Sequence, residues 1–313
     1  MKRIFARMLG IVVLAALLAC MAGCGEGQPV SKEGNEETVR IVTSFYPMYV
    51  LTLNVTKDIE GVEVVNMAQA QTGCLHDYQL STADLKVLDT ADILVINGAG
   101  MESFLDKITE EMPQLKVITA SEGIDLLDDE HEMHQAEGAK NPHVWVSPSL
   151  AAQEVRTIAA GLAEADGLHA AQYTANAEAF AAELEMLSAE MKTALDTLPH
   201  RKIVTFHEAF PYFAREFQLE IAAVVENEPG QEPVAKEMDA LIRTIQQEKI
   251  PAVFVESQYA DTTARLIAEE TGAAIYELDL LVLGDEEASA EDVRGAYEKA
   301  MRANLAVLME ALQ

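Results

Sequence analysis

The feature that most restricts the fold of this chain is an alternation of short β-branched runs with helical stretches, which occurs twice. The runs lie at 39–43, 62–67, 92–96 and 116–120, and again at 202–206, 220–225, 252–256 and 274–278. Each run has the length and apolar content of a buried strand. Strands that alternate with helices form parallel sheets covered on both faces. The sequence therefore predicts an α/β protein with two (β/α)4 lobes, each on a four-stranded, mostly parallel sheet.

The segment between the two sets has no strand signal. From Ser149 to about Leu198 it is rich in Ala, Glu, Leu, Met and Lys, which favour helices, and only Asp166-Gly167 interrupts it. We expect one helix before this dipeptide and a long helix over 170–197, which would be roughly 40 Å long at 1.5 Å per residue. A helix of that length can join two lobes. Two ordinary packed helices are the alternative.

The first residues of the chain have the pattern of an export signal. Lys2, Arg3 and Arg7 precede an apolar run over 11–19, and small residues follow as far as Cys24. This run is too short to span a bilayer comfortably. The segment ending at Cys24 has the form of a bacterial lipobox, in which the cysteine is lipidated and becomes the mature N-terminus. Cys20 ends a second candidate box, and a plain secretory signal or an uncleaved anchor is the alternative.

These patterns predict the organisation of the whole chain. We expect a signal peptide, a lipidated N-terminus with a flexible tether, a first lobe, a linking helix and a second lobe, at 1–23, 24–38, 39–169, 170–198 and 199–313. The tether is rich in Gly, Pro, Ser, Asn and Glu, which do not build a core. With Cys20 removed and Cys24 lipidated, Cys74 is the only free thiol, so we expect no intramolecular disulfide.

The charge of the chain excludes one class of partner. The sequence has 22 Lys and Arg against 52 Asp and Glu, a formal net charge of −30. Proteins that bind nucleic acids use positive charge to neutralise phosphates, so we expect no nucleic-acid partner. Cations are the more natural ligand, although acidity by itself mostly confers solubility.

Three of the seven histidines, His76, His143 and His207, lie in loops that follow or flank predicted strands. Open α/β sheets bind their ligands at such loops. Each histidine alone could be structural, whereas three imidazoles together suit a first-row divalent ion. Imidazole sites favour Zn²⁺, and Mn²⁺ generally requires more carboxylate ligands. His169 and His200 are interpreted as surface residues.

Two further features bear on this predicted site. An acidic stretch over 128–134 contains His131 and His134, and it is either a solvated loop or a weak, mobile collector of cations. Cys74 stands two residues before His76, where it could supply a soft thiolate ligand. A buried structural thiol is the favoured interpretation of this residue.

With these residues in view, the chain resembles the substrate-binding lipoproteins of bacterial zinc and manganese ABC transporters. The resemblance covers nearly everything after the tether. It depends on the motifs Thr43-Ser44-Phe45-Tyr46-Pro47, His76-Asp77-Tyr78, Asn97-Gly98-Ala99-Gly100-Met101-Glu102, Asn141-Pro142-His143-Val144-Trp145 and Phe206-His207-Glu208-Ala209-Phe210. It implies two lobes joined by one rigid helix, with a metal ion in the cleft between them. His76 and His143 would come from the first lobe and His207 from the second.

The resemblance also implies a fourth ligand on the loop after the last strand, usually a carboxylate. The residue that aligns with this ligand is Val282, which cannot coordinate a metal. Asp279 is the nearest carboxylate and the preferred candidate, followed by Asp285. A water molecule is a further alternative.

These expectations combine into a function. By resemblance, the protein is a monomer anchored by its lipid to the outer face of the bacterial cell membrane, where it captures Zn²⁺ and delivers it to the permease of an ABC transporter. It would not be an enzyme. One rival is a secreted zinc hydrolase with Glu208 as general base, although the chain lacks a His-Glu-x-x-His helix. The other rival is a surface adhesin with incidental metal.

Overall fold

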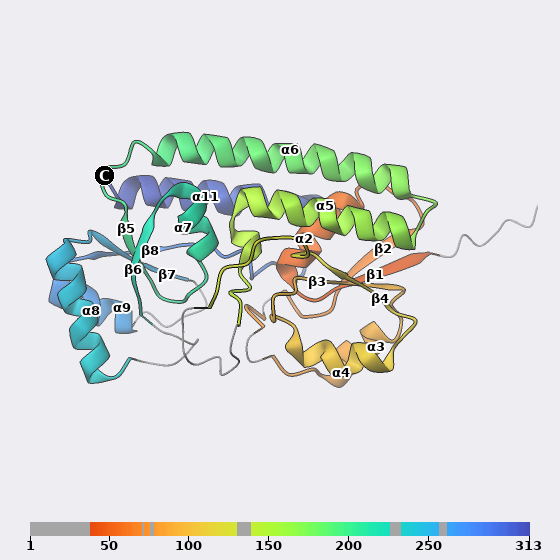
Figure 1. Cartoon of the computed structure of the whole chain (residues 1–313), viewed down its shortest axis with the longest axis horizontal. Helices are drawn as coiled ribbons and strands as arrows, with labels where there is room; N and C mark the ends of the chain where they lie inside the picture. The colour runs from red at the N-terminus through yellow and green to blue at the C-terminus, as the bar shows by residue number, and fades with distance from the viewer. Residues whose placement is uncertain (1–37, 71, 76–77, 130–138, 226–232, 257–261) are drawn as a thin grey trace, which may run out of the picture. The chain divides into compact units, whose positions relative to one another are not determined.

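The structure is a computed structural model of the chain, and it describes residues 38–70, 72–75, 78–129, 139–225, 233–256 and 262–313 (Figure 1). The expected signal peptide, the lipidation site at Cys24 and the tether to residue 37 lie outside the described residues. Residues 38–313 belong to one compact unit. None of the helices among the described residues is both long and apolar enough to cross a bilayer.

The first lobe is a parallel sheet of four strands in the order β2-β1-β3-β4. Its strands are β1 (Val39–Thr43), β2 (Val62–Asn66), β3 (Ile93–Ile96) and β4 (Lys116–Thr119). Its helices are α2 (Tyr46–Val55), α3 (Thr82–Leu88) and α4 (Asp106–Glu111), with short 3-10 turns η1 (Ser103–Leu105) and η2 (Val144–Val146). In this order β1 and β3 are the central strands.

The second lobe repeats this order as β6-β5-β7-β8, again with parallel pairing throughout. Its strands are β5 (Lys202–Thr205), β6 (Glu220–Val224), β7 (Ala252–Val255) and β8 (Ala274–Glu277). Its helices are α7 (Pro211–Phe217), α8 (Ala235–Glu248) and α9 (Thr262–Thr271). The chain ends with α10 (Ala290–Arg294), which packs against α2 of the first lobe, and α11 (Ala296–Ala311). The predicted fold class, two four-stranded α/β lobes, is confirmed.

The predicted strands match the observed ones to within one residue at each end, and most differ only at the last residue. Those last residues make one more ladder bond before the chain turns. The N–H of Phe206 donates to the carbonyl of Phe254 at 3.0 Å, and the N–H of Leu278 donates to the carbonyl of Val255 at 2.9 Å. The apolar run therefore extends one residue beyond the regular strand, into the loop where functional residues begin.

Two long antiparallel helices pack against each other, and the second of them connects the lobes. They are α5 (Pro148–Ala165) and α6 (Ala170–Leu195). The 26 residues of α6 correspond to about 39 Å, and α6 extends from one sheet to the other (Figure 1). Between them, the imidazole Nδ1 of His169 lies 2.6 Å from a carboxylate oxygen of Asp166. The prediction that His169 is a plain surface residue was wrong, because this pair holds it half-buried at the helix junction.

A single hydrophobic core continues from one lobe to the other. It contains Ile41 of β1, Ile203 of β5 and the buried face of α6 between them. That face consists of Tyr173, Ala177, Phe180, Ala181, Leu184, Leu187, Met191 and Leu195, which recur at the three- and four-residue spacing of one helix side. The opposite face of each sheet has a separate, smaller core. The shared core means that the lobes cannot separate widely without exposing apolar surface.

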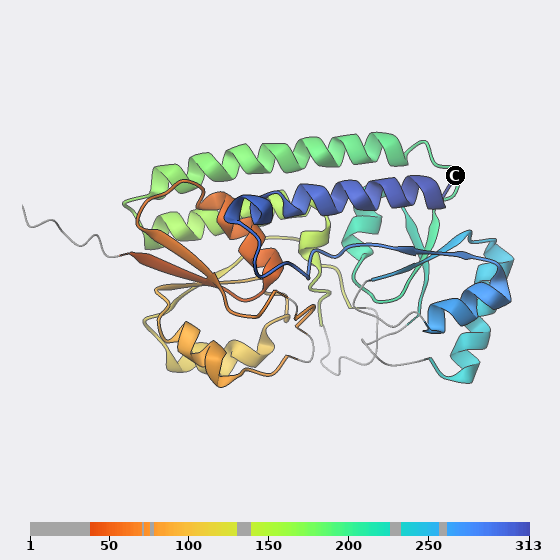
Figure 2. The same cartoon turned by 180° about the vertical axis from the view of Figure 1, so that it is seen from behind.

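After β8 the chain returns to the first lobe, a connection that the sequence did not indicate. The indole N–H of Trp145 donates to the carbonyl of Leu280 at 2.8 Å. The N–H of Gly284 donates to the carbonyl of Ala70 at 2.8 Å, and a Cβ on Gly284 would lie 2.2 Å from the ring of Tyr46. The chain then runs back as α11, which packs along α6 (Figure 2). The lobes are thus joined by α6 and by this return.

Candidate metal centre

Two of the three predicted histidine ligands lie together, although they come from different lobes. His143 follows β4 through a long loop and immediately precedes η2, and His207 is the second residue after β5. In the order β6-β5-β7, the neighbours of β5 lie on its two sides, so the strand order reverses at the carboxyl end of β5. Open sheets bind ligands at such a point. The two imidazole rings meet edge to face, with centroids 4.8 Å apart. Both are buried, at 1% and 3% exposure.

A third potential ligand joins these imidazoles. Cys74 lies in the loop after β2, and its Sγ is 4.0 Å from Nε2 of His143. One ligand atom from each of Cys74, His143 and His207 lies within 4.8 Å of the others. Among the described residues, these three form the group of metal-ligating side chains. The sequence favoured a structural role for Cys74, and the structure instead places this half-buried thiol beside two imidazoles.

The Asn141 side chain fixes the orientation of His143. Its Oδ1 accepts the backbone N–H of His143 at 3.1 Å and lies 3.2 Å from the ring Nδ1, while its Nδ2 donates to the carbonyl of Glu208 at 2.8 Å. A backbone N–H can only donate and a carbonyl can only accept, so both partners define which amide atom is oxygen. The proton of the His143 ring then resides on Nδ1, and the lone pair of Nε2 faces Cys74.

Asn141 also connects the two lobes at the site. Glu208, its carbonyl partner, follows His207 directly, so one buried amide is bonded next to both histidines. The hydroxyl of Tyr212 in α7 donates to the carbonyl of Asn141 at 2.8 Å and accepts the N–H of Leu127 at 3.0 Å. The sequence analysis included Asn141 in a motif but predicted no function for its side chain. Its position two residues before a predicted ligand was the available signal.

A second buried network supports the same loop from the first sheet. The carboxylate of Glu102 accepts the backbone N–H groups of Asn97 and Gly98 and the hydroxyl of Ser44, at 2.7–3.0 Å. The Asn97 amide donates to the carbonyl of Pro142 at 2.9 Å, directly before His143. Gly98 has a φ of +84°, and a Cβ there would lie 2.3 Å from Thr119. Burial raises the pKa of Glu102, although these hydrogen bonds oppose the rise.

A fully buried carboxyl group, Glu154 of α5, lies near this network and has no hydrogen-bond partner among the described residues. Burial, and secondarily the charge of Glu102, raises the pKa of Glu154 well above its ordinary value. Burial therefore disfavours the charged form of the Glu154 carboxyl group. It does not belong to the group of metal-ligating side chains.

The third predicted ligand, His76, lies outside the described residues, whereas the residues on both sides of it are described. Leu75 is completely buried, and its carbonyl accepts the N–H of Tyr78 at 3.0 Å. The hydroxyl of Tyr78 donates to Asp84 at 2.9 Å, in the capping box that begins α3. Burial and this hydrogen bond raise the pKa of Tyr78 to about 12. Both ends of the short segment 76–77 are therefore anchored.

The acidic stretch over 128–134 is also described only in part, as residues 128–129. His131 and His134 lie outside the described residues, and the chain on both sides of them pairs in an antiparallel bridge. Asp128 pairs with Lys140, whose ammonium is 2.5 Å from the Asp128 carboxylate. The N–H of Asn141 donates to the carbonyl of Leu127 at 3.0 Å. The stretch thus begins and ends next to the segment that carries His143.

Asp279, the predicted fourth ligand, is placed differently. Its carboxylate Oδ1 accepts the N–H of Leu281 at 2.7 Å, and its backbone N–H and carbonyl both bond to the amide of Asn304 at 2.8 Å. Its side chain is exposed. Val282, the residue at the aligned position, is buried. Within the part of the chain that the structure describes, Asp279 is not in the group formed by Cys74, His143 and His207.

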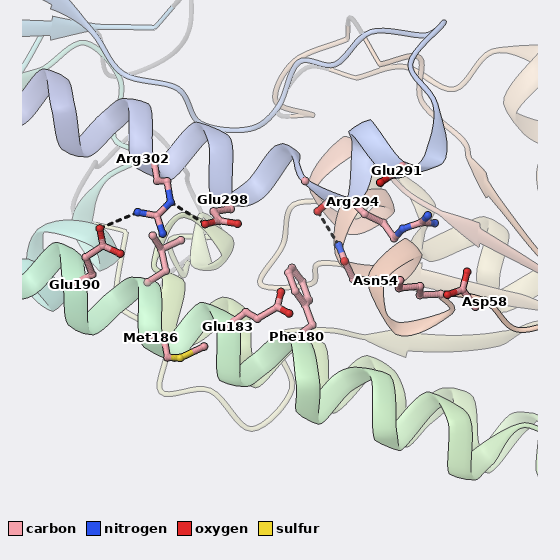
Figure 3. Close-up of a pocket in the computed structure, with 13 residues that line it drawn as sticks. Asn54, Asp58, Phe180, Glu183, Met186, Glu190, Glu291, Arg294, Glu298 and Arg302 are labelled. Atoms are coloured by element: carbon pink, nitrogen blue, oxygen red, sulfur yellow. Dashed lines mark hydrogen bonds and ion pairs between the residues drawn. The ribbon is translucent and has the colours of Figure 1, made fainter.

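A separate groove of about 660 Å³ lies between α6, the end of α2 and the start of α11 (Figure 3). It is lined by acidic residues and by Arg294 and Arg302, and it contains no histidine or cysteine. Arg302 spans it with ion pairs to Glu190 at 2.8 Å and to Glu298 at 2.7 Å. Arg302 therefore pairs with two carboxylates of the groove, and the group of metal-ligating side chains found among the described residues lies elsewhere.

A comparison with protein families matches residues 41–311 to the family described as zinc-uptake complex component A, periplasmic. Among curated proteins, the chain is similar to the high-affinity zinc uptake system protein ZnuA of Bacillus subtilis (strain 168). The two are 29% identical over 320 residues, which cover 98% of each chain.

Two solved structures share the fold. A crystal structure of ZnuA aligns with a TM-score of 0.76 and 31% identity, over 88% of this chain and 100% of that one. The laminin-binding protein Lmb of Streptococcus agalactiae aligns with a TM-score of 0.74 and 28% identity, over 88% and 100%. That structure is described as a bifunctional protein with adhesin and metal transporting activity.

Proposed function

Because the chain belongs to the periplasmic component A family of zinc-uptake complexes, we propose that it captures Zn²⁺ outside the cytoplasmic membrane and delivers the ion to an ABC permease. The predicted function class, a metal substrate-binding protein of an uptake system, is confirmed by the family match and by the zinc-uptake relative. Zinc is the cargo in this proposal. The observation that carries it is the meeting of two buried imidazoles, His143 and His207, from different lobes.

We assign His76, His143 and His207 as the imidazole ligands. His76 follows Cys74 by two residues, so its Cα lies at most about 7 Å along the chain from that of a residue already in the group. For a fourth ligand, the sequence analysis names Asp279 or a water molecule. Imidazole donors favour Zn²⁺ over Mn²⁺. His131 and His134 would collect cations beside this site.

The arrangement also supports release of the ion. Ligands from two lobes separate when one lobe shifts slightly, and the loss of one ligand weakens the whole set. The continuous core and the return of the chain after β8 oppose a wide opening, so we expect a displacement of small amplitude at the site. Because imidazoles bind metal only when neutral, acid is also expected to release zinc.

The family description places such proteins in the periplasm. We propose further that the export signal ends at residue 23, that Cys24 rather than Cys20 is lipidated, and that the monomeric protein is held at the outer face of the membrane by the tether over 24–38. The lobes would be 39–169 and 199–313, with the linking helix over 170–198. Mass spectrometry of the mature N-terminus in wild type and Cys24→Ala tests the anchor, since the variant should lack the lipid.

The relatives are transport proteins, and we propose that this chain has no enzymatic activity. The side chain of Glu208, the general base of the hydrolase alternative, is not in the group formed by Cys74, His143 and His207. Zinc-loaded protein incubated with ester, peptide and phosphate substrates should release no product. Adhesion stays a second candidate because Lmb is described as an adhesin as well as a metal transporter, and laminin binding with and without zinc tests it.

Substitution of the ligands tests the main proposal. His76→Ala, His143→Ala and His207→Ala should each lower zinc affinity sharply in competition with a chromogenic chelator, because each removes one donor. The exposed His200 is the matched control, and His200→Ala should bind zinc as wild type does. Three ligand variants with wild-type affinity would exclude this site.

A further inference from the structure

We propose that the Sγ of Cys74 binds the metal together with His143 and His207, in the place that the sequence gave to the carboxylate of Asp279, and that it directs the site toward zinc and chemically similar ions and against manganese. This inference rests on the proposed metal-binding function and specifies its ligand set. It starts from the group of Cys74, His143 and His207, whose ligand atoms lie within 4.8 Å of one another.

The distances suit a tetrahedral ion. With a Zn–S distance of about 2.3 Å and Zn–N distances of about 2.0–2.1 Å, a sulfur and a nitrogen ligand lie about 3.6 Å apart in a tetrahedral site. The observed distance from Cys74 Sγ to His143 Nε2 is 4.0 Å. These two atoms are therefore about 0.4 Å farther apart than in a tetrahedral site, and the ligand atom of His207, which lies within 4.8 Å of both, would also have to move closer when an ion binds.

The Nε2 atom of His143 and the Sγ atom of Cys74 can both donate an electron pair to a metal ion placed between them. Asn141 binds the Nδ1 side of the His143 ring, so its Nε2 presents a lone pair on the side of Cys74. When zinc binds, the Cys74 thiol loses its proton to solvent and the thiolate sulfur forms the Zn–S bond, with no change of oxidation state. The neutral imidazoles of His143 and His207 add no charge, so the thiolate lowers the charge of the bound Zn²⁺ by one.

The backbone around Cys74 holds the thiol in place. Gly73 has a φ of +81°, a left-handed conformation that glycine adopts without strain, and Leu75 is completely buried. A few residues earlier, Ala70 is bonded to Gly284 of the returning segment. Cys74 itself packs against the main core. The thiol is therefore positioned by its neighbours before any metal arrives.

The carboxylate of Asp279, by contrast, already forms a hydrogen bond within its own loop. Its carboxylate accepts the N–H of Leu281, a residue with a φ of +61°. That conformation is unfavourable for leucine, so the hydrogen bond stabilises a turn that the loop requires. To coordinate a metal, Asp279 would have to leave this turn. Cys74 needs no such rearrangement.

The consequence is a change in metal preference. Thiolate is a soft ligand that binds Zn²⁺ and Co²⁺ well, whereas Mn²⁺ prefers carboxylate, carbonyl and water oxygen. A site with three imidazoles and a carboxylate would accept both classes of ion. Replacement of the carboxylate by a thiolate therefore makes Cys74 a specificity-determining residue.

Cobalt is the probe that tests this proposal in the full chain, because a cobalt–thiolate bond gives a charge-transfer absorption band in the near ultraviolet. We expect this band in wild type, in Asp279→Asn and in the Cys20→Ser/Cys24→Ser double variant, which controls for the other thiols. Cys74→Ser should lose the band and keep the weaker cobalt d–d bands of the imidazole complex, which shows that the variant is folded. Its zinc affinity should fall by more than about tenfold, since loss even of an outer partner of a ligand has an effect of about 10–100-fold. Its preference for zinc over manganese should narrow.

Cobalt that binds to wild type without a charge-transfer band would overturn the assignment of Cys74 and leave the proposed function intact. So would a loss of zinc affinity in Asp279→Asn together with wild-type affinity in Cys74→Ser. Wild-type protein that binds neither cobalt nor zinc would overturn both the assignment and the proposed function.

Discussion

Replacement of Asn141 by alanine is the sharpest test of how the structure prepares the metal centre. The variant loses the acceptor for the His143 ring and the donor to the Glu208 carbonyl, at 3.2 and 2.8 Å. Loss of the partner that orients a ligand lowers metal affinity by about 10–100-fold. This range corresponds to about 1.4–2.7 kcal/mol of binding free energy. We therefore expect zinc affinity to fall by that factor in competition with a chromogenic chelator.

The same substitution should destabilise the protein. Asn141 is 2% exposed, so its removal leaves the buried N–H of His143 and the carbonyl of Glu208 without this partner. An unsatisfied buried group costs about 1–3 kcal/mol of folding free energy, which denaturant unfolding of the metal-free protein will measure. Asn141→Asp keeps an acceptor for the ring and makes it a stronger one, so this variant should retain zinc affinity while it loses the bond to Glu208.

Asn176 provides the matched control. Its amide donates to the carbonyls of Val55 and Lys57 at 3.1 and 2.8 Å and ties α6 to the end of α2. Asn176→Ala should therefore lose stability without losing zinc affinity. If Asn141→Ala binds zinc as tightly as wild type, the ring of His143 is held by packing alone, and the orienting role of Asn141 is refuted.

Three other predictions follow from groups outside the ligand set. Glu154→Met should raise the free energy of unfolding at neutral pH by about 1–3 kcal/mol, because it removes a buried group that lacks a partner. The pKa of Glu154 is raised in the folded state, so wild type should lose stability relative to this variant as pH rises above the ordinary value of 4.5; denaturant unfolding across pH tests the sign, and a variant less stable than wild type contradicts it. Spectrophotometric titration of Tyr78→Phe should lack an ionisation near pH 12 that wild type has, while an unchanged curve would argue against the bond from Tyr78 to Asp84. Arg302→Gln should leave zinc affinity unchanged, since the groove that Arg302 spans includes none of Cys74, His143 and His207; a chelator titration that shows weaker binding would link the groove to the site.

The predicted ligands illustrate how far reasoning from the sequence reached. The setting of His207 just after a strand was visible in the sequence, because the end of a β-branched run marks the edge of a sheet, and His143 was visible as part of a loop between predicted elements. The sequence named Cys74 as an alternative thiolate ligand but favoured a structural thiol, because it could not show that the thiol lies beside His143. The Cys74 sulfur and the His143 nitrogen belong to residues 69 positions apart, and no local pattern reports that distance. The predictions for His76 and for Asp279 as a ligand remain predictions.

The sequence by itself determined the two parallel sheets and the long helix between them, because the periodicity of apolar residues and the propensities of each run are local properties. It also determined the family, since the motifs that indicate the family are short contiguous segments of the sequence. Only the tertiary structure decided that Asn141 bonds beside both histidines, that the segment after β8 returns to the first lobe, and that the thiol of Cys74 faces an imidazole. Each of these contacts joins loops whose positions depend on the packing of the whole core. No repeating pattern of residues in the sequence indicates such a position.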